Sequence, residues 1–140
     1  MSRRRPAPPA GVVKESTVMK DVLAMLKILQ QSANFTYERN HVGTIRVKTP
    51  SSMRDAYRGK KQHFMRVGTK GAPDIRVFME DGKTLHMEVK TSKGRLNANQ
   101  KAYKEQLESL GHEYVVVRSA ADAAEALAER IPALARIQAR

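Results

Sequence analysis

One stretch of the chain, residues 71–100, places two carboxylates, a lysine and an amide at spacings that a strand–turn–strand–helix unit would bring together. Its sequence is GAPDIRVFMEDGKTLHMEVKTSKGRLNANQ. Apolar residues alternate on both sides of a glycine-containing turn, which predicts two β-strands. In the second strand Glu88 and Lys90 lie on one face and Val89 on the other, because side chains alternate along a strand. The spacing therefore predicts a carboxylate and an ammonium group side by side, with an apolar anchor behind them.

The turn between these strands decides whether Asp74 joins Glu88. A two-residue turn would put Asp74 on the opposite face of the hairpin, because a shift of one residue reverses every side chain. A three-residue loop, residues 80–82, pairs Asp74 with Glu88 and pairs apolar residues with one another. Such a loop needs a residue in the left-handed conformation, which Gly82 supplies. We therefore expect the three-residue loop.

Two carboxylates that face each other repel unless a cation lies between them. Oxygen ligands favour Mg²⁺ or Mn²⁺, and such an ion can polarise a phosphodiester and lower the pKa of a bound water. We expect Asp74, Glu88 and the backbone carbonyl of Val89 to hold the metal. Lys90 would orient the attacking water or stabilise the developing charge. The alternative is a surface hairpin with a Glu–Lys pair, since these short patterns often occur by chance.

The composition limits the classes of protein to which the chain can belong. Its 140 residues suggest one domain. Its 26 Lys+Arg and 14 Asp+Glu give a net charge of +12, which points to a polyanionic partner. Solubility or a ribosomal-type binding protein would also explain the charge. Cysteine is absent, which excludes disulfides and thiolate metal sites and favours an intracellular protein. The four histidines lack zinc-like spacing, and no apolar run approaches the roughly 20 residues of a membrane span.

The first half of the chain contains a tail, a helix, a strand and a basic region. Residues 1–13 are basic and proline-rich, and we expect them to be disordered. Residues 15–31 show helical apolar spacing, and residues 35–40 predict a strand. Residues 44–70 carry eight cations against one acid, namely Arg46, Lys48, Arg54, Arg58, Lys60, Lys61, Arg66 and Lys70 against Asp55. We expect an excursion around residues 50–62, with residues 64–67 returning as a strand, and we expect the region to bind phosphate groups, with a merely solvated loop as the alternative.

A helix follows the basic loop of residues 91–96. Asn97 and Gln100 form a capping box at its start, and Gly111 ends it. Gln100 begins a stripe of side chains at helical spacing that continues through Tyr103, Leu107 and Leu110. We therefore expect Gln100 on the buried face, directed toward the sheet, although capping alone would explain its type.

The last part of the chain predicts one strand and one helix. Residues 113–118 form a β-branched run typical of a central strand buried on both faces, returning parallel to the strand of Glu88. Residues 120–130 predict an Ala-rich helix capped by Ser119, which Pro132 ends before a frayed tail.

The motifs of residues 73–100, taken together, resemble those of a known protein family. Pro73-Asp74 with Glu88-Val89-Lys90 is the PD…EXK signature, and together with Gly94-Arg95-Leu96 and Gln100 it resembles the VRR-NUC branch of the PD-(D/E)XK nuclease superfamily. The resemblance covers residues 15–122. It implies an α/β fold, a restriction-endonuclease-like core whose mixed sheet of about four or five strands is flanked by helices. It also implies a nuclease domain over residues 14–131, followed by a C-terminal tail over 132–140.

The same resemblance implies further site residues. It places Glu15 in the active site, holding a second metal or its water, although a charge on the helix dipole is an ordinary explanation for this residue. It makes Gln100 a site residue that orients Lys90 or the phosphate. The residues expected to contact DNA are Arg39, Asn40, Lys60, Lys61, Lys70, Lys93 and Arg95.

The function implied is Mg²⁺-dependent, structure-selective hydrolysis of DNA, acting on branched substrates such as Holliday junctions in replication or repair. We expect a homodimer in a bacterial or phage-infected cytoplasm, with no membrane and no small-molecule cofactor. Met19, Met25, Leu26 and the Ala-rich helix offer interface material, although the core would explain them almost as well. The alternatives are a restriction-type or tRNA-splicing-like nuclease of the same fold, or a non-catalytic nucleic-acid-binding module. A complete Asp–Glu–Lys set argues against pure binding.

Overall fold

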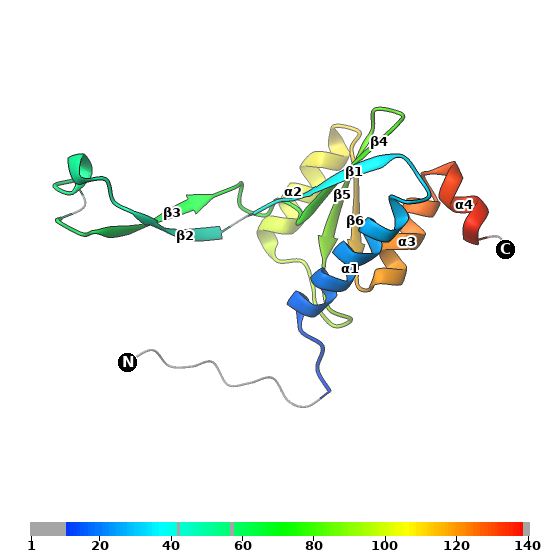
Figure 1. The fold of residues 1–140 in the computed structure, drawn as a ribbon, viewed down its shortest axis with the longest axis horizontal. Coiled ribbons are helices and arrows are strands. Elements are labelled where there is room, and N and C mark those ends of the chain that lie inside the picture. The colour runs from blue at the N-terminus through cyan, green and yellow to red at the C-terminus, as the bar shows by residue number, and fades with distance from the viewer. Residues whose placement is uncertain (1–10, 42, 57, 139–140) are drawn as a thin grey trace. The chain divides into compact units, whose positions relative to one another are not determined.

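The computed structural model describes residues 11–41, 43–56 and 58–138 (Figure 1). The elements in chain order are α1 (Glu15–Leu29), β1 (Phe35–Arg39), β2 (Gly43–Lys48), the 3₁₀ helix η1 (Ser51–Met53), β3 (Gln62–Val67), β4 (Ile75–Met79), β5 (Thr84–Val89), α2 (Ala98–Ser109), β6 (Glu113–Val117), α3 (Ala120–Ala128) and α4 (Pro132–Gln138). Most of the expected basic tail, residues 1–10, lies outside the described residues. Among the helices that are described, none has the length and apolar character needed to cross a membrane.

Four strands form the main sheet in the order β1, β4, β5, β6 (Figure 1). β1 pairs antiparallel with β4, and β4 pairs antiparallel with β5. β5 reaches β6 through α2, and a helical crossover of this kind joins parallel neighbours. The sheet is therefore mixed, and the predicted α/β class with a sheet of about four or five strands is confirmed.

The position of β6 differs from the prediction. This strand lies at the edge of the sheet, not in its centre. Its residues Tyr114 and Val117 are nevertheless buried. A β-branched run indicates that the faces of a strand are covered, and it carries no information about the number of hydrogen-bonded neighbours.

The β4–β5 hairpin has the predicted register. Ile75 pairs with Met87 and Val77 with Leu85, and all four side chains are fully buried. The loop has three residues, with the N–H of Met79 bonded to the carbonyl of Lys83 at 3.0 Å and Gly82 at φ +79°. Each buried apolar side chain contributes about 1.5–3 kcal/mol to folding. The register is therefore held by the core as well as by the turn.

The chain forms two compact units, which are residues 1–34, 89–94 and 116–140 in the first and residues 35–88 and 95–115 in the second. In the first unit α1 packs against α3. The buried residues of α1 are Val18, Met19, Val22 and Leu26, and those of α3 are Ala123, Ala126, Leu127 and Ala128. Met19 and Leu26 therefore belong to the core of this chain, which removes them from the expected interface material.

A helix, α4, occupies the place where a frayed tail was expected. It begins at Pro132, and proline suits the first turn of a helix because that position needs no N–H donor. Ile131 and Leu134 are only 8% and 2% exposed, and α4 packs against α3. Burial of these two side chains explains why the chain continues as a helix.

β2 and β3 form a separate two-stranded antiparallel sheet, here called the ribbon, residues 43–67. The expected excursion of residues 50–62 lies between its strands and contains η1. Thr49 is 1% exposed, and its N–H bonds the carbonyl of Lys61 at 2.8 Å. A second bond of 2.8 Å joins Oγ1 of Thr49 to Nδ1 of His63. The sequence predicted the returning strand but not β2.

Candidate active site

Asp74 and Glu88 lie close together at the end of the β4–β5 hairpin. Asp74 immediately precedes β4, and continuing the observed register places it across from Glu88. Each residue offers a carboxylate oxygen, and the two oxygens are within 4.8 Å of each other. Glu88 is 1% exposed, whereas Asp74 is half-buried. A buried carboxylate beside a second one fits a hard divalent cation, which takes oxygen ligands and neutralises both charges.

Asn40 fixes the backbone that presents Asp74. Its N–H bonds the carbonyl of Asp74 at 2.7 Å, and its side-chain amide donates to the carbonyl of Pro73 at 3.2 Å. Asn40 was expected to contact DNA. In the structure its side chain is engaged by the Pro73–Asp74 backbone, and it is the neighbouring Arg39 that is exposed.

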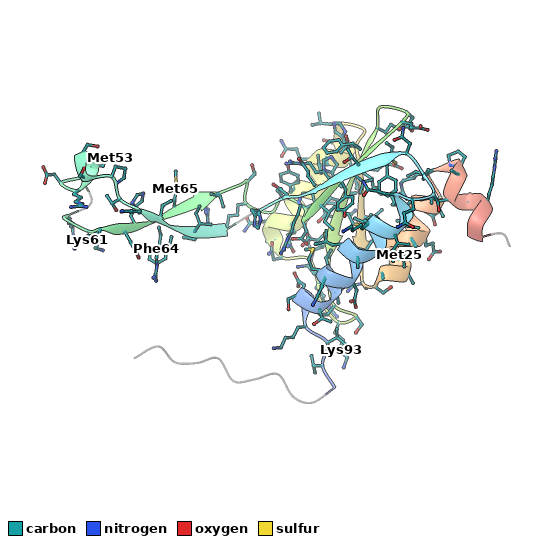
Figure 2. The ribbon with its side chains drawn as sticks, in the orientation of Figure 1. Met25, Met53, Lys61, Phe64, Met65 and Lys93 are labelled. Carbon is teal, nitrogen blue, oxygen red and sulfur yellow. The ribbon has the colours of Figure 1, made fainter. Side chains whose placement is uncertain are left out.

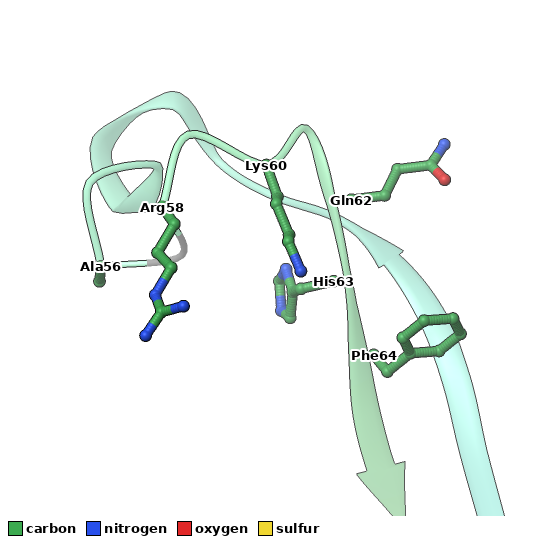
Figure 3. A pocket seen from close by; sticks show the side chains of 6 residues that line it. All are labelled: Ala56, Arg58, Lys60, Gln62, His63 and Phe64. Carbon is green, nitrogen blue, oxygen red and sulfur yellow. The ribbon is translucent and has the colours of Figure 1, made fainter.

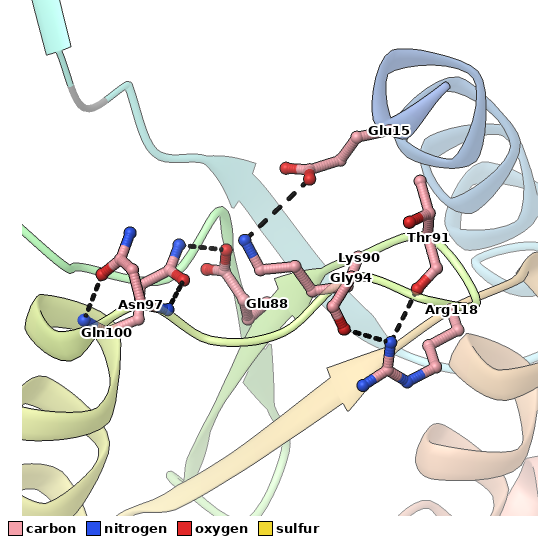
Figure 4. Close-up of polar contacts among 8 residues, drawn as sticks. All are labelled: Glu15, Glu88, Lys90, Thr91, Gly94, Asn97, Gln100 and Arg118. Atoms are coloured by element: carbon pink, nitrogen blue, oxygen red, sulfur yellow. Dashed lines mark hydrogen bonds and ion pairs between the residues drawn. The ribbon is translucent and has the colours of Figure 1, made fainter. Parts of the chain in front are cut away.

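Gln100 joins α2 to Glu88 (Figure 4). Its Oε1 accepts the N–H of Asn97 at 3.0 Å, and the Asn97 side chain accepts the N–H of Gln100 at 2.9 Å, which completes the predicted capping box. The same side chain donates from Nε2 to Oε1 of Glu88 at 2.8 Å. The stripe that follows it is less buried than expected, since Leu110 is 69% exposed.

Lys90 pairs with Glu15 within the first unit. Lys90 is 8% exposed, and its Nζ lies 3.9 Å from a carboxylate oxygen of Glu15 (Figure 4). The backbone N–H of Lys90 bonds the carbonyl of Val117 at 3.0 Å, which anchors the end of β5 to β6. Glu15 is the first residue of α1 and its side chain is half-exposed. It therefore has both a favourable place on the helix dipole and a buried cationic partner.

Arg118 organises the basic loop after β5, a role that the sequence did not indicate. Its Nη1 donates to the carbonyl of Thr91 at 2.6 Å and to that of Gly94 at 2.7 Å (Figure 4). The only sequence feature that could have indicated this role is a basic residue at the end of a predicted strand. The expected DNA-contacting residues of this loop, Lys93 and Arg95, are both exposed. The expected residues Lys60, Lys61 and Lys70 are exposed as well.

Two further buried polar side chains, one in β6 and one in β5, were also missed. Tyr114 is 7% exposed, and within the described part of the chain its hydroxyl has no hydrogen-bond partner. Burial raises the pKa of Tyr114, and the negative charges of Glu88 and Asp74 raise it further. His86 is 9% exposed and its ring lies edge-on to that of His112 at 5.9 Å. Burial lowers the pKa of His86, with smaller contributions from the charges of its neighbours, so neutral imidazole is favoured.

The sequence of the chain matches one known protein family. The family model described as the VRR-NUC domain matches residues 26–121, more than half of the chain. One solved structure, titled a VRR-NUC domain, is similar at 20% identity and a TM-score of 0.48, covering 83% of this chain and 95% of that one. No curated protein matches the chain. The matched range contains Asp74, Glu88, Lys90 and Gln100, whereas Glu15 precedes it.

Proposed function

The chain belongs to the VRR-NUC domain family, a family of nucleases, and from this premise we propose that it is a Mg²⁺-dependent DNA endonuclease. One observation carries the proposal. The carboxylate oxygens of Asp74 and Glu88 lie within 4.8 Å of each other, with Glu88 buried and held by Gln100. Burying a charge is costly unless it is paired, so a buried carboxylate beside a second one is best explained by a cation that both bind.

Asp74, Glu88 and the backbone carbonyl of Val89 would hold Mg²⁺ or Mn²⁺. These are all oxygen donors, the type that both ions prefer. When bound, the ion would polarise the phosphodiester and acidify a water molecule. Glu88 can serve only if its oxygens point consistently to one place, and the hydrogen bond from Gln100 fixes one of them.

Lys90 would position the attacking water and stabilise the charge that develops on the phosphate. Its side chain is almost buried, which strengthens its electrostatic effect, and Glu15 balances its charge. Lys90 follows Glu88 by two residues, so an alternating strand directs both side chains to the same side. Because Glu15 pairs with Lys90, we propose that Glu15 is the third carboxylate of the site, acting on a second metal or on its water.

DNA would be held by exposed cations of the chain. The set is Arg39, Lys60, Lys61, Lys70, Lys93 and Arg95, all exposed. Asn40 would act mainly through the backbone of Pro73 and Asp74, because its side chain bonds there. Such phosphate contacts position a duplex without reading its sequence.

Branched DNA is the substrate that we propose, with a homodimer as the active form. One site of this size cuts one strand, whereas a four-way junction needs two symmetric incisions. A two-fold dimer supplies paired sites of matching symmetry. Since Met19, Leu26 and three of the six α3 alanines are buried within the chain, the dimer rests on this symmetry argument.

The decisive experiment compares labelled linear duplex, flap and four-way junction DNA with and without Mg²⁺. We expect Mg²⁺-dependent cleavage that is fastest on the junction, and sedimentation at micromolar concentration should show a dimer. Cleavage that persists in EDTA would refute the metal-dependent mechanism. A monomer that nicks linear duplex as fast as junctions would leave a nuclease without structure selectivity.

A further inference from the structure

The two faces of the ribbon differ in chemistry. The strand register pairs Thr44 with Arg66, Arg46 with Phe64 and Lys48 with Gln62, and these six residues share one face. This face, called the cationic face, carries three cations and no acid. The opposite face carries Ile45, Val47, His63, Met65 and Val67. Figure 2 shows the labelled side chains of Phe64 and Met65 on opposite sides of the ribbon.

Phe64 lies in the middle of the cationic face and is 67% exposed. The guanidinium carbon of Arg46 lies over its ring at 5.5 Å from the centroid. A stacked guanidinium keeps its N–H donors free in its own plane, so Arg46 is held in place without losing hydrogen-bonding capacity. The Phe64 ring and the Arg46 guanidinium are therefore both accessible to a partner on this face.

We propose that the cationic face of the ribbon enters the major groove of duplex DNA, with Phe64 directed at the base edges. The proposal rests on DNA being the substrate, as proposed above. A two-stranded ribbon fits the major groove of B-DNA, about 12 Å wide. Two cationic residues that are two positions apart on one strand have Cα atoms about 6.6 Å apart. This spacing is close to two base-pair rises of the duplex. Phenylalanine can contact the methyl group of thymine, which the major groove presents.

A pocket in the ribbon is lined by β3 and by the segment that precedes this strand. It is about 400 Å³ in volume and is lined by Ala56, Arg58, Lys60, Gln62, His63 and Phe64 (Figure 3). Arg58 and Lys60 extend toward the side of His63, whereas Gln62 and Phe64 extend to the other side (Figure 3). The two pocket cations therefore lie apart from the cationic face and are not counted among its three cations.

The test measures binding of the full chain to a 20-base-pair duplex in EDTA, where no divalent metal supports cleavage, over a range of salt concentrations. Arg46→Ala with Arg66→Ala should reduce the slope of log affinity against log salt by about 1.8, since each lost phosphate contact removes about 0.9. The control, Lys20→Ala with Lys27→Ala, removes two exposed lysines of α1 and should leave the slope near the wild-type value.

Two further comparisons test the groove. The wild type should prefer duplex DNA to duplex RNA of the same sequence, because the RNA major groove is too narrow, and the double variant should lose this preference. Replacing thymine by uracil should weaken wild-type binding several-fold and leave the Phe64→Ala variant unaffected. An unchanged salt slope in the double variant would overturn the proposal. A changed sedimentation coefficient with unchanged DNA binding would also overturn it and assign the face to a second copy of the chain.

These outcomes are separable from failure of the nuclease proposal. A wild type that does not bind DNA at all refutes both proposals. A second outcome is that the wild type binds and cleaves DNA while the double variant has the same salt slope and the same preference for DNA over RNA. That result would refute the ribbon proposal and leave the nuclease proposal standing. Circular dichroism of each variant confirms that the exposed substitutions leave the fold intact.

Discussion

Gln100 donates a hydrogen bond from Nε2 to Oε1 of Glu88 at 2.8 Å while its own Oε1 accepts the N–H of Asn97. One side chain therefore caps α2 and orients the buried carboxylate. The capping and the site explanations of this residue are compatible, because the amide has a donor end and an acceptor end that face different partners.

Gln100→Glu separates these two roles. Glutamate keeps the oxygen that accepts from Asn97, so α2 should retain its helicity. It replaces the donor with a second negative charge facing Glu88, which should lower the cleavage rate at least about tenfold, since hydrogen bonds to charged groups are worth about 1.5–3 kcal/mol. Gln100→Ala should lose the cap as well, at about 1 kcal/mol of stability. Gln106→Glu on the exposed face of α2 is the control, and equal activity in Gln100→Glu and wild type would refute the orienting role.

The carboxylates and the lysine give the most direct prediction. Asp74→Asn, Glu88→Gln and Lys90→Ala should each reduce cleavage by at least about 100-fold, the loss typical of removing one preorganised charge. DNA binding measured by fluorescence anisotropy should survive. Calcium should support binding but little cleavage, because its looser coordination places water poorly.

A matched control lies in the turn of the same hairpin. Asp81→Asn keeps the oxygen that accepts the N–H of Lys83, and Asp81 is exposed. Its activity should equal that of the wild type. Full activity in Asp74→Asn would end the metal-site hypothesis.

The sequence predicted the Asp74–Glu88 pair because local rules determine it. The two-residue period of the strands and the conformation needed at Gly82 leave only one register that buries the apolar side chains. It did not predict the contacts of Arg118, since these depend on the path of a loop in space. It also misplaced β6, because covered strand faces do not reveal the order of strands. The role of Asn40 depends on β1 pairing with β4, a long-range pairing that no local pattern indicates.

Tyr114→Phe tests whether the buried hydroxyl is a structural group. The hydroxyl has no partner among the described atoms, so its removal should leave the free energy of unfolding unchanged or raise it by up to about 1 kcal/mol. Urea unfolding in EDTA measures this, with Tyr103→Phe on the half-buried side of α2 as the control. A loss above about 1.5 kcal/mol would show that the hydroxyl donates to a bound water.

Lys60→Glu with Lys61→Glu should weaken binding to all DNA sequences alike and flatten the salt slope. Each lost phosphate contact lowers the slope by roughly 0.9, and phosphate contacts carry no sequence information. Lys20→Glu with Lys27→Glu makes the same change of charge on α1. If both pairs weaken binding equally, the effect is one of net charge and the excursion has no specific role.

Gly71 links the loop before Asp74 to the first turn of α2. It adopts φ +85°, and a Cβ at this position would overlap the backbone carbonyl of Asn99, coming within 2.6 Å of the carbonyl carbon. Gly71→Ala should therefore push apart the segments that carry Asp74 and Gln100, lowering both the free energy of unfolding and the cleavage rate. Gly82→Ala is the matched control, since Gly82 has φ +79° and open space around it.

The free energy of unfolding of the Gly82→Ala control should fall only by the cost of placing alanine in a left-handed conformation, about 1–2 kcal/mol. The control should keep its cleavage activity. Gly71→Ala should lose at least about 1 kcal/mol more, because backbone atoms must shift to relieve the overlap. Urea unfolding and single-turnover cleavage of both variants make the comparison. Equal losses of stability in the two would mean that the α2 terminus moves freely, and the close approach would then not be what holds Asp74 in place.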